Sequence, residues 1–596
     1  MIPPPPERLR AYPGPSLFAA GRCVLLHVAG IDGVDLPEDW AAALRRHPAL
    51  AEAASPPAGA AAAVAWLAQE LQRALGHPVP DGTGGGTAAD HVVVPVWDAE
   101  VGAAAARTAF AIVAAPGSQR GEVVAHLNRF FATANVIDYS ESEARVIRAA
   151  ERRGIPWNRL VPGHRLLRLG QGAWQMHVQH TFTPATSRIA TYISTHKDIA
   201  AALLRAQGLP VPAGRRVGSA DAAVAAAAAI GYPVVVKPTA TDYGTAVSLH
   251  LRDEADVRRA YAAAARHGPV LVERQLPGDH TRLVVIDGRF ISAVRQDPAQ
   301  VTGDGRRSVA GLIDAVNAER TDDVSASFKK IAIDAEATLL LERQGLGLAS
   351  VPEAGRRVVL RHTSNTSRGG TARNATALVH PDNARLAERA AAVVGLDVAG
   401  IDLITPDITR SFREVGGGIC EINATPGFFM REPGYLIEDA FLDGHFRAGD
   451  RGLVPIVALL AEPGEGAAAA EEMARGLRAR VRGVAVVAPC GARIDARIDD
   501  WPIAERTIAD ATATVLNDPA TRAAVVCLDR RTIAEDGIGF ARCAVALMPP
   551  DAAGAAAALL AAHADERIDA ADRARVAAAL DAVAATASRA APARRR

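Results

Sequence analysis

The sequence predicts a multidomain protein of mixed α+β and α/β class. Three observations support this prediction: a length of 596 residues, an alternation of short apolar strands with alanine-rich helical stretches, and a change of that pattern along the chain. At roughly 150 residues per domain, the length allows about four domains. The composition, with 49% hydrophobic and 22% charged residues, is typical of a globular protein.

The predicted domain boundaries follow the changes of pattern. Residues 1–160 alternate strands such as CVLLHVAG with helical alanine stretches and form an N-terminal α+β domain. Residues 161–450 form a middle domain of strands, helices and glycine-rich turns, in which two β-rich runs around Asp287-Gly288 predict a hairpin. Residues 451–550 begin a third α/β domain with VPIVALL, and residues 551–596 form an Ala/Arg-rich tail, expected as helix or disorder.

Charge and composition exclude several function classes. The chain balances 66 Lys and Arg against 66 Asp and Glu, so no basic excess is present to bind nucleic acid. The start, MIPPPPERLR, lacks the apolar core of a signal peptide, and no strongly hydrophobic run reaches the ~18 residues that a membrane span needs. The five cysteines show no CxxC spacing. We therefore expect a cytoplasmic protein without a membrane or nucleic-acid partner.

Two lysines of the middle domain stand where phosphate-binding cations are expected. Lys197 follows TYISTH in a predicted helix, and Lys237 ends the buried strand YPVVVK. A lysine at a strand end can reach a phosphate, and the N–H groups of the turn at 239–247 can cap another. Taken alone, each lysine is also compatible with a solvated surface position.

Hard oxygen ligands follow further along the chain. Asp402 lies in GLDVAGIDLI, and Glu421 and Asn423 lie in GGGICEINATPG. Glu421 and Asn423 are two residues apart on a predicted strand, so their side chains share one face. Together with Asp402 they suit Mg²⁺ that bridges nucleotide phosphates. A buried polar pair at a strand end is the alternative for Glu421 and Asn423 alone.

Two arginines flank the predicted hairpin. Arg282 precedes the turn and Arg295 follows it. Both side chains are suited to stabilising charge on an acyl phosphate. Ordinary salt bridges are the alternative for each of them.

The order of these motifs resembles the ATP-grasp domain of cyanophycin synthetase. The motifs are Lys197, VVVKP, VERQLPG, RLVVIDG, VTGDG, SRGGTA, GID and CEINATPG, and the upstream segments GPSLF, ERRGIPW and QHTFTPATSRIATYIS resemble the same family. The resemblance covers about residues 12–545. It implies an ATP- and Mg²⁺-dependent ligase that converts a carboxylate into an acyl phosphate, which an amine then attacks.

The resemblance also implies a role for each site residue. The groups that would bind ATP are Lys197, Lys237, Gly244 of the phosphate loop, and the adenine hinge of Glu273, Arg274, Gln275 and Leu276. Arg282 and Arg295 would act on the reacting phosphate. The metal would be held by Asp402, Glu421 and Asn423. The growing peptide would be bound by Ser187 and Arg188.

The chain departs from the family pattern in the phosphate loop. Where the family has DGNHGRGV, residues 240–247 read ATDYGTAV, which keeps Gly244 and lacks the basic residue. Fewer glycines limit the approach of the backbone to phosphate, so we expect altered loop closure and rate. Thr281 stands at a family histidine, and Ser367-Arg368-Gly369-Gly370 replaces STGG.

Two further sites of the family are expected to be absent. The third domain resembles a truncated Mur-ligase-like domain, whose phosphate loop GTNGKTT corresponds to residues 461–467. Glu465 occupies the lysine position and Gly466 the magnesium-binding hydroxyl position, so we expect a catalytically silent domain used for packing or dimerisation. The metal cluster of many N-domains is replaced by Ala62, Ala65 and Trp66, with Glu70 retained. The histidines at 177, 180 and 196 are interpreted as ordinary polar residues.

One ligation site therefore remains in the predicted architecture. Shortened relatives with an inactive Mur-like domain repolymerise β-aspartyl-arginine dipeptides, and the resemblance implies this activity on a dipeptide and a peptide polymer. A ligase for a different amino acid or natural-product carboxylate, and a non-catalytic scaffold partner of a full synthetase, are the alternatives. A homo-oligomer, with a dimer favoured, is expected by analogy.

Overall fold

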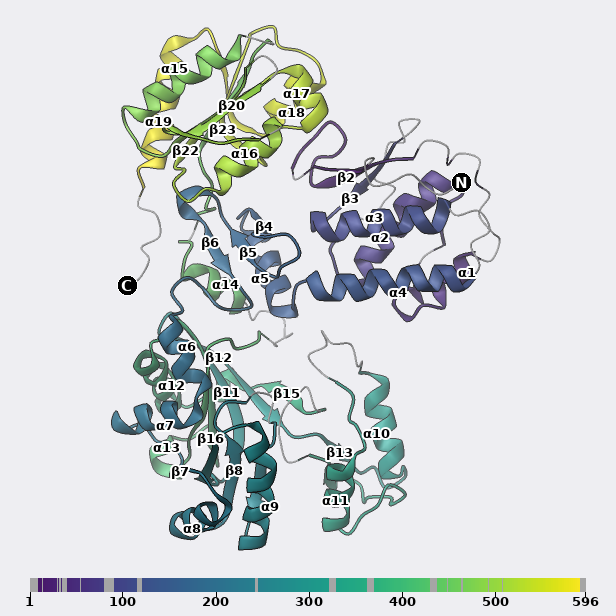
Figure 1. The fold of residues 1–596 in the computed structure, drawn as a ribbon, viewed down its shortest axis with the longest axis vertical. Helices are drawn as coiled ribbons and strands as arrows, with labels where there is room; N and C mark the ends of the chain where they lie inside the picture. Colours follow the sequence, from purple (N-terminus) through teal and green to yellow (C-terminus); the bar gives the residue numbers. More distant parts are fainter. Residues whose placement is uncertain are drawn as a thin grey trace. The chain divides into compact units, whose positions relative to one another are not determined.

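The computed structural model describes residues 9–12, 14–28, 31, 34, 40–53, 55–79, 91–114, 120–241, 245–320, 329–361, 369–428, 437–447, 449–462, 465–490, 493–505 and 507–589. They form two compact units (Figure 1). Unit 1 comprises Met1–Asp138, Glu151–His177 and Gly449–Ala593, and unit 2 comprises Tyr139–Ala150, Val178–Ala448 and Arg594–Arg596.

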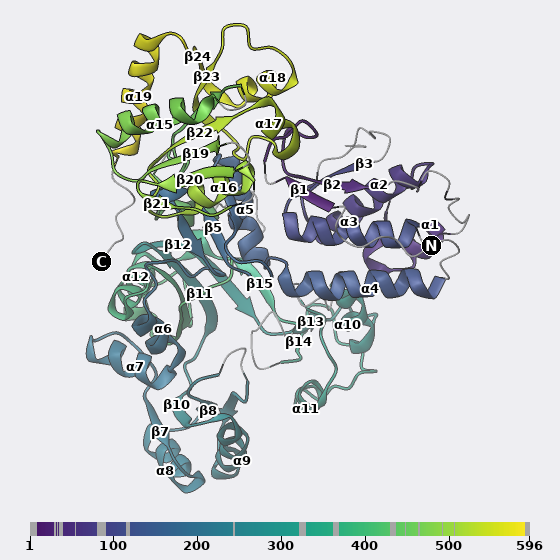
Figure 2. The same cartoon turned by 45° about the horizontal axis from the view of Figure 1, so that its top comes forward.

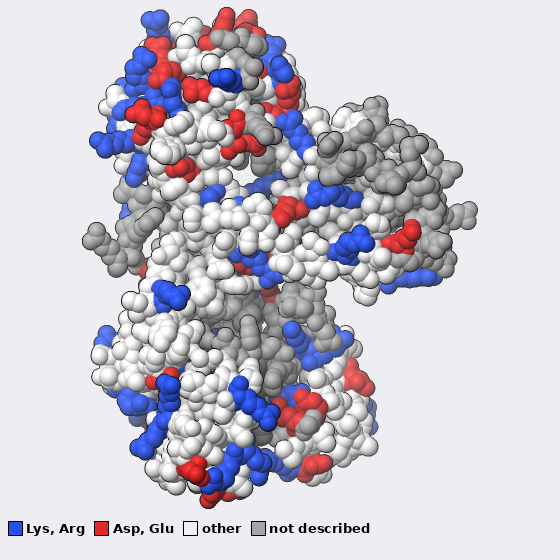
Figure 3. Space-filling view, viewed as in Figure 1, with Lys and Arg blue, Asp and Glu red and all other residues white. Residues whose placement is uncertain are grey.

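Both units combine helices and sheets, so the predicted mixed class is confirmed. Among the described helices, none has both the length and the apolar character that crossing a membrane requires. On the face seen in Figure 3, side chains of both charge signs are interspersed, in keeping with the balanced composition. The four predicted domain boundaries stay a prediction, because each unit is assembled from separate segments of the chain.

The N-terminal part of unit 1 packs helices against a three-stranded antiparallel sheet of order β1-β2-β3. Gly102 lies where a Cβ atom would collide with Val96, so this glycine lets its helix approach the chain beside the sheet. Glu70, the retained acidic residue, pairs with Arg73 at 2.6 Å. The elements are β1 (Leu9–Tyr12), β2 (Cys23–His27), β3 (His91–Pro95), α1 (Trp40–Arg45), α2 (Ala60–Ala74), α3 (Ala99–Ala114) and α4 (Arg120–Ile137).

A small sheet of order β4-β5-β6 and one further helix follow in the chain. Trp157 and Trp97 both donate their indole N–H to Glu151, each at 2.8 Å, which satisfies two buried aromatic donors with one carboxylate. The elements are α5 (Glu141–Arg152), β4 (Trp157–Arg159), β5 (Leu167–Leu169) and β6 (Met176–Val178).

The C-terminal part of unit 1 is a seven-stranded sheet of order β21-β20-β19-β22-β18-β23-β24, covered on both faces. Helices α15 and α19 cover one face, and α16, α17 and α18 cover the other (Figure 2). Its strands are β18 (Ile456–Leu460), β19 (Val484–Cys490), β20 (Arg493–Ile498), β21 (Trp501–Pro502), β22 (Ala523–Leu528), β23 (Cys543–Met548) and β24 (Ala564–Asp569). Its helices are α15 (Gly466–Arg478), α16 (Ile508–Asn517), α17 (Arg530–Asp536), α18 (Ala555–Ala562) and α19 (Arg573–Ala587).

The segment at the end of β18 is the predicted former phosphate loop. Glu465 is the residue before α15 and makes no side-chain capping bond. A Cβ atom on Gly466 would collide with Cys527 Sγ and press on Ala461, so position 466 has no room for a hydroxyl side chain. Pro463 and Gly464 lie outside the described residues. The catalytic silence of this domain stays a prediction that these two features favour.

Within residues 551–596, expected to form a separate tail, the described part at 551–589 contributes to the sheet of unit 1. Ala564–Asp569 forms β24 and pairs in parallel with β23. Helix α19 buries Ala579, Val583, Ala584 and Ala587 against the sheet. Alanine and valine are enough for this contact because a helix with small side chains can approach a sheet closely.

Unit 2 contains three sheets, each with its own apolar core. Helices α8 and α9 cover one face of the sheet of order β7-β10-β8-β9, and α6, α7 and α12 cover one face of the sheet of order β15-β12-β11-β16-β17. The third sheet, β13-β14, packs with α10 and α11. In the first two sheets, the helices cover one face only. Most charged residues of the predicted site lie on the opposite faces of these sheets.

The strands of unit 2 are β7 (Gly214–Val217), β8 (Val234–Pro238), β9 (Ser248–Leu251), β10 (Val270–Arg274), β11 (Asp279–Ile286), β12 (Arg289–Asp297), β13 (Gln300–Thr302), β14 (Arg357–Val359), β15 (Thr371–Asn374), β16 (Val398–Thr405) and β17 (Gly418–Asn423). Its helices are α6 (Arg188–Thr195), α7 (Lys197–Ala206), α8 (Ala220–Ile230), α9 (Glu254–Ala264), α10 (Val309–Ala318), α11 (Ala335–Arg343), α12 (Pro381–Val394), α13 (Phe412–Val415) and α14 (Ile437–Asp443).

The predicted hairpin is confirmed as β11–β12. Asp287 and Gly288 form its turn with φ values of 51° and 73°, the left-handed conformation that a two-residue hairpin turn favours. The pairing shifts by one residue between Val284 and Val285, so the hairpin contains a β-bulge.

The C-terminal segment is required for the stability of unit 1. A chain that ends at residue 550 lacks β24 and α19 and leaves apolar side chains of β23 and α15 exposed. We expect this variant to lose more than about 3 kcal/mol of unfolding free energy or to aggregate, as measured by urea unfolding followed by circular dichroism. A chain that ends at residue 589 is the control and keeps full stability. Equal stability of both chains would contradict the prediction.

Candidate functional site

Lys237 and Glu273 form a buried ion pair on the free face of the β7–β10–β8–β9 sheet. Lys237 lies opposite Leu271, and Glu273 lies opposite Val235, so the two side chains are diagonal neighbours on adjacent strands. Lys237 Nζ lies 2.5 Å from Glu273 Oε2. Burial lowers the pKa of Lys237, but the charge and hydrogen bond of Glu273, together with the nearby Cys420 and Glu421, outweigh it and hold this pKa above its usual value. Lys237 is therefore a buried cation at neutral pH and not the solvated lysine of the alternative interpretation.

The predicted adenine hinge consists of the last two residues of β10 and the two residues that follow it. The Arg274 guanidinium donates to Ile230 O at 2.6 Å, and the Gln275 carboxamide accepts from the backbone N–H of His250 at 2.7 Å. Leu276 lies beside Gly418 of β17. These contacts fix the segment between two sheets of unit 2, and the adenine role of its residues stays a prediction.

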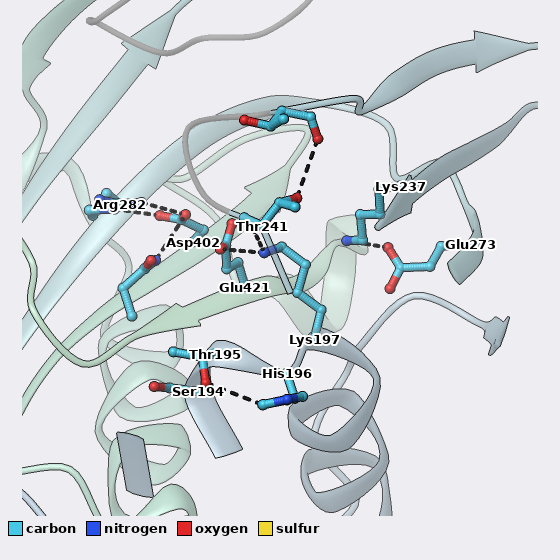
Figure 4. Close-up of polar contacts among 12 residues, drawn as sticks. Ser194, Thr195, His196, Lys197, Lys237, Thr241, Glu273, Arg282, Asp402 and Glu421 are labelled. Atoms are coloured by element: carbon cyan, nitrogen blue, oxygen red, sulfur yellow. Dashed lines mark hydrogen bonds and ion pairs between the residues drawn. The ribbon is translucent and has the colours of Figure 1, made fainter. Parts of the chain in front are cut away.

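Arg282 and Asp402 form a two-bond ion pair across β11 and β16. The two residues lie directly opposite each other, and Arg282 Nε and Nη2 donate to the two Asp402 carboxylate oxygens at 2.6 and 2.7 Å. His280 Nε2 lies 3.3 Å from the same carboxylate, and the Asn423 amide donates to it at 3.3 Å (Asp402 and Arg282 are labelled in Figure 4). Asp402 on β16 is therefore surrounded by donors from the two strands that flank it, β11 and β17.

The charges around Asp402 set its protonation. Burial raises the pKa of Asp402, but Arg282 and His280 outweigh it and hold the pKa well below its usual range. Asp402 in turn raises the pKa of Arg282, which burial alone lowers. Asp402 is thus ionised at every physiological pH, as a metal ligand must be.

His280 was missed because the sequence comparison placed the family histidine at Thr281. Strand periodicity contains the signal, since His280 and Arg282 are two residues apart and share one face of β11. The structure therefore puts an imidazole at the site in spite of the apparent substitution.

A β-bulge in β17 arranges the carboxylates. Asp402 pairs with Glu421 and Leu403 pairs with Ile419, which leaves Cys420 as the extra residue. Ile419 and Ile422 both enter the apolar core in spite of their spacing of three. Glu421 and Asn423 share the opposite face, as the sequence predicts. Burial raises the pKa of the Cys420 thiol, whose charged neighbours are Asp402, Lys237, Glu421 and Glu273.

Lys197 connects the two larger sheets of unit 2. It is the first residue of α7, and its ammonium donates to Thr241 O at 2.6 Å and lies 3.1 Å from Glu421 Oε1 (Figure 4). We call the set formed by Lys197, Lys237, Glu273, Arg282, Asp402, Glu421 and Asn423 the lysine–carboxylate cluster. It brings together seven of the residues that the sequence selects.

The cluster alone supplies only some of the oxygen ligands that a magnesium ion needs. Asp402 and Glu421 are paired residues of neighbouring strands and supply hard carboxylate oxygens, and Asn423 adds an amide oxygen. Among the described residues, no group of three His, Cys, Asp or Glu side chains is arranged to hold a metal ion. Magnesium commonly binds one or two carboxylates and completes its shell with phosphate oxygens and water. The donor set therefore fits Mg²⁺ that is shared with a nucleotide.

Arg295 lies outside the lysine–carboxylate cluster, and its role at the reacting phosphate stays a prediction. Without the bulge in β11–β12, Arg295 would lie opposite His280 and share the face of Arg282. With the bulge it lies opposite Thr281 on the other face. There it binds Asp279 at 2.9 Å and Asp297 at 3.2 Å, which is the salt-bridge alternative.

The remaining predicted residues lie outside the cluster. Ser187 is the N-cap of α6, where its hydroxyl accepts from Ala190 N–H at 3.0 Å, and Arg188 is exposed beside it. The preceding loop is fixed by Asp397, which accepts from Thr183 at 2.5 Å and Thr186 at 2.7 Å. Gly244, Ser367 and Arg368 lie outside the described residues.

The lowered pKa of Asp402 predicts an acid-dependent loss of stability. A depressed carboxyl pKa stabilises the fold above the pKa of an unfolded aspartate, about 4, and this contribution is lost as the pH falls below it. We expect about 2–3 kcal/mol of unfolding free energy to be lost on this account. Urea unfolding between pH 7 and pH 2.5 should show a smaller acid loss in Asp402→Asn than in the unchanged protein. Equal acid losses would contradict this assignment.

Comparisons with known proteins agree with these motifs. Residues 191–280 match the family model of the ATP-grasp domain. The chain is 33% identical to cyanophycin synthetase from Nostoc sp. over 406 residues, which are 66% of this chain and 44% of that protein. It is 31% identical to cyanophycin synthetase from Synechocystis sp. over 414 residues, 68% of this chain and 47% of that protein.

Glutathione biosynthesis proteins are also similar. A bifunctional one from Mannheimia succiniciproducens is 31% identical over 342 residues, 54% of this chain and 45% of that protein. The crystal structure of a bifunctional glutathione synthetase from Pasteurella multocida matches with a TM-score of 0.41 and 27% identity, covering 57% of this chain and 48% of that one. The chain spans less than half the length of these curated relatives. It thus contains an ATP-grasp domain and is homologous to cyanophycin synthetases over about two thirds of its own length.

Proposed function

We propose that unit 2 is an ATP-dependent carboxylate–amine ligase that forms peptide bonds through an acyl phosphate. The observation that carries the proposal is the contact between Lys197 and Glu421, which joins the phosphate-binding lysines to the carboxylates of Asp402 and Glu421. Acyl phosphate formation needs cations on the phosphates and oxygen ligands on magnesium within one site. The homologous cyanophycin synthetases and the ATP-grasp match support the same class of reaction.

Each residue of the cluster has its own role in the proposed reaction. Lys197 and Lys237 bind the phosphates, and Glu273 orients Lys237. Asp402, Glu421 and Asn423 hold Mg²⁺, which supplies Lewis-acid stabilisation of the transferred phosphoryl group. Arg282 holds Asp402 ionised and in place, and its guanidinium faces the same side of the sheet, where it stabilises charge on the acyl phosphate.

The proposed substrates are β-aspartyl-arginine dipeptides. In this reaction the main-chain carboxylate at the end of a β-Asp-Arg chain is phosphorylated by ATP. The α-amine of an incoming dipeptide then attacks the acyl carbon, phosphate leaves, and one peptide bond is added with release of ADP. Ser187 and Arg188, exposed at the start of α6, are the proposed contacts for the growing peptide, and a homodimer is the proposed assembly.

A ligase for another carboxylate is the second candidate. The similarity to a glutathione biosynthesis protein favours it, because similar chains can act on different substrates. The departures of the chain at residues 240–247 from the cyanophycin pattern also favour it.

Incubation of the purified protein with β-Asp-Arg dipeptide, ATP and Mg²⁺ tests the proposal. We expect dipeptide-stimulated ADP release and a peptide polymer, detected by a coupled ADP assay and by mass spectrometry. Lys237→Ala and Glu421→Ala should reduce both signals by at least about 10³-fold, because each removes a group that stabilises charge in the reaction.

A panel of other amines and carboxylates separates the two candidates. ADP release with another pair, and none with the dipeptide, would favour the second candidate. Nucleotide binding without turnover on any pair would reject a ligase and leave a scaffold function.

A further inference from the structure

The carboxylates that would hold magnesium are both paired with side-chain cations in this structure. Arg282 binds Asp402 through two hydrogen bonds, and Lys197 lies 3.1 Å from Glu421. A metal ion that approaches the cluster therefore meets carboxylates whose charge is already compensated. The metal ion can therefore bind only after one of these ion pairs has separated.

The two pairs differ in how easily they separate. Arg282 and Asp402 are directly opposite on paired strands, and Asp402 is also contacted by His280 and Asn423. Lys197 reaches Glu421 from a different element, the start of α7, and Glu421 retains 27% side-chain exposure. The Lys197–Glu421 contact is thus the one that a ligand can replace without disturbing the sheet.

Lys197 is also a cation that a phosphate would attract. Its other contact is the neutral carbonyl of Thr241, at 2.6 Å. A phosphate oxygen is a stronger partner for an ammonium group than a carbonyl, because the hydrogen bond is then charge-assisted on both sides. When the Lys197 ammonium binds a phosphate oxygen instead of Glu421, the Glu421 carboxylate becomes available to a metal ion.

We propose that Lys197 acts as a placeholder cation on Glu421, so that the protein binds a divalent metal ion only together with a nucleotide. The inference rests on the proposed nucleotide site. It agrees with the finding that the described residues contain no group of three His, Cys, Asp or Glu side chains that could hold a metal ion, since the phosphates supply what the cluster lacks. Lys197 is in this role a positioning residue for the metal as well as a phosphate ligand.

The chain offers a matched control in Lys237. This lysine also forms a buried ion pair, but its partner Glu273 lies on the other sheet, outside the predicted metal set. Removing the charge of Lys237 therefore measures how the loss of any one nearby cation changes the affinity for the metal ion. Removing the charge of Lys197 tests the release of Glu421.

Equilibrium dialysis with Mn²⁺ alone, a stand-in for Mg²⁺, measures the predicted difference. We expect weak Mn²⁺ binding by the unchanged protein and at least about tenfold tighter binding by Lys197→Met, because the competing unit charge is removed from the carboxylate. Lys237→Met should change the affinity less than threefold. Adding Glu421→Gln to Lys197→Met should abolish the gain.

In a second arm, a non-hydrolysable ATP analogue is added to the unchanged protein. The number of Mn²⁺ ions bound per protein molecule should then rise to about one. Tight Mn²⁺ binding by the unchanged protein without nucleotide would overturn the inference, and so would an unchanged affinity in Lys197→Met with a native melting curve. If Lys197→Met does not fold, Lys197→Gln takes its place. Failure of the analogue to bind contradicts the proposed function, whereas the metal-alone arm is decided without any nucleotide.

Discussion

The pairing of the buried charges in the lysine–carboxylate cluster is the constraint on which the site depends. A lysine, arginine or carboxylate removed from water is costly unless a partner of opposite charge compensates it. Lys237 with Glu273, Arg282 with Asp402 and Lys197 with Glu421 each meet this condition. The protein can thus keep a dense set of charges inside unit 2 before any ligand arrives, and the same pairs hold these charges in place.

The sheets supply the geometry that makes these pairs possible. One face of each sheet is used for apolar packing against helices, which leaves alternate positions of each strand for charged side chains. Cross-strand register then decides which charges meet, as with Arg282 opposite Asp402 and Asp402 opposite Glu421. Two bulges modify this register, one in the β11–β12 hairpin and one in β17.

Strand periodicity was sufficient to predict much of the site from the sequence. It predicted the turn at Asp287 and Gly288 and the shared face of Glu421 and Asn423, and motif order selected Asp402 and the two lysines. Arg295 lies on the other face of the sheet from Arg282, and Cys420 is the extra residue of β17; each of these two features follows from a β-bulge. A bulge adds one residue to a strand and reverses which face the following residues occupy, and it depends on pairing that no local pattern encodes. The strand β24 was missed for another reason, since an Ala/Arg-rich segment has weak β-propensity and pairs only because β23 provides an edge.

Gly466 limits which side chains can stand at the start of α15. Its position is enclosed by Cys527 and Ala461, so a larger residue there requires a simultaneous change on a neighbouring strand. Exchanging Glu465 for lysine would reverse one charge and still leave no space for the hydroxyl that a phosphate loop of the GTNGKTT type carries. A single substitution at either position therefore does not create a phosphate loop of this type. The C-terminal sheet would need several coordinated changes at residues 465 and 466 and at their neighbours to form one.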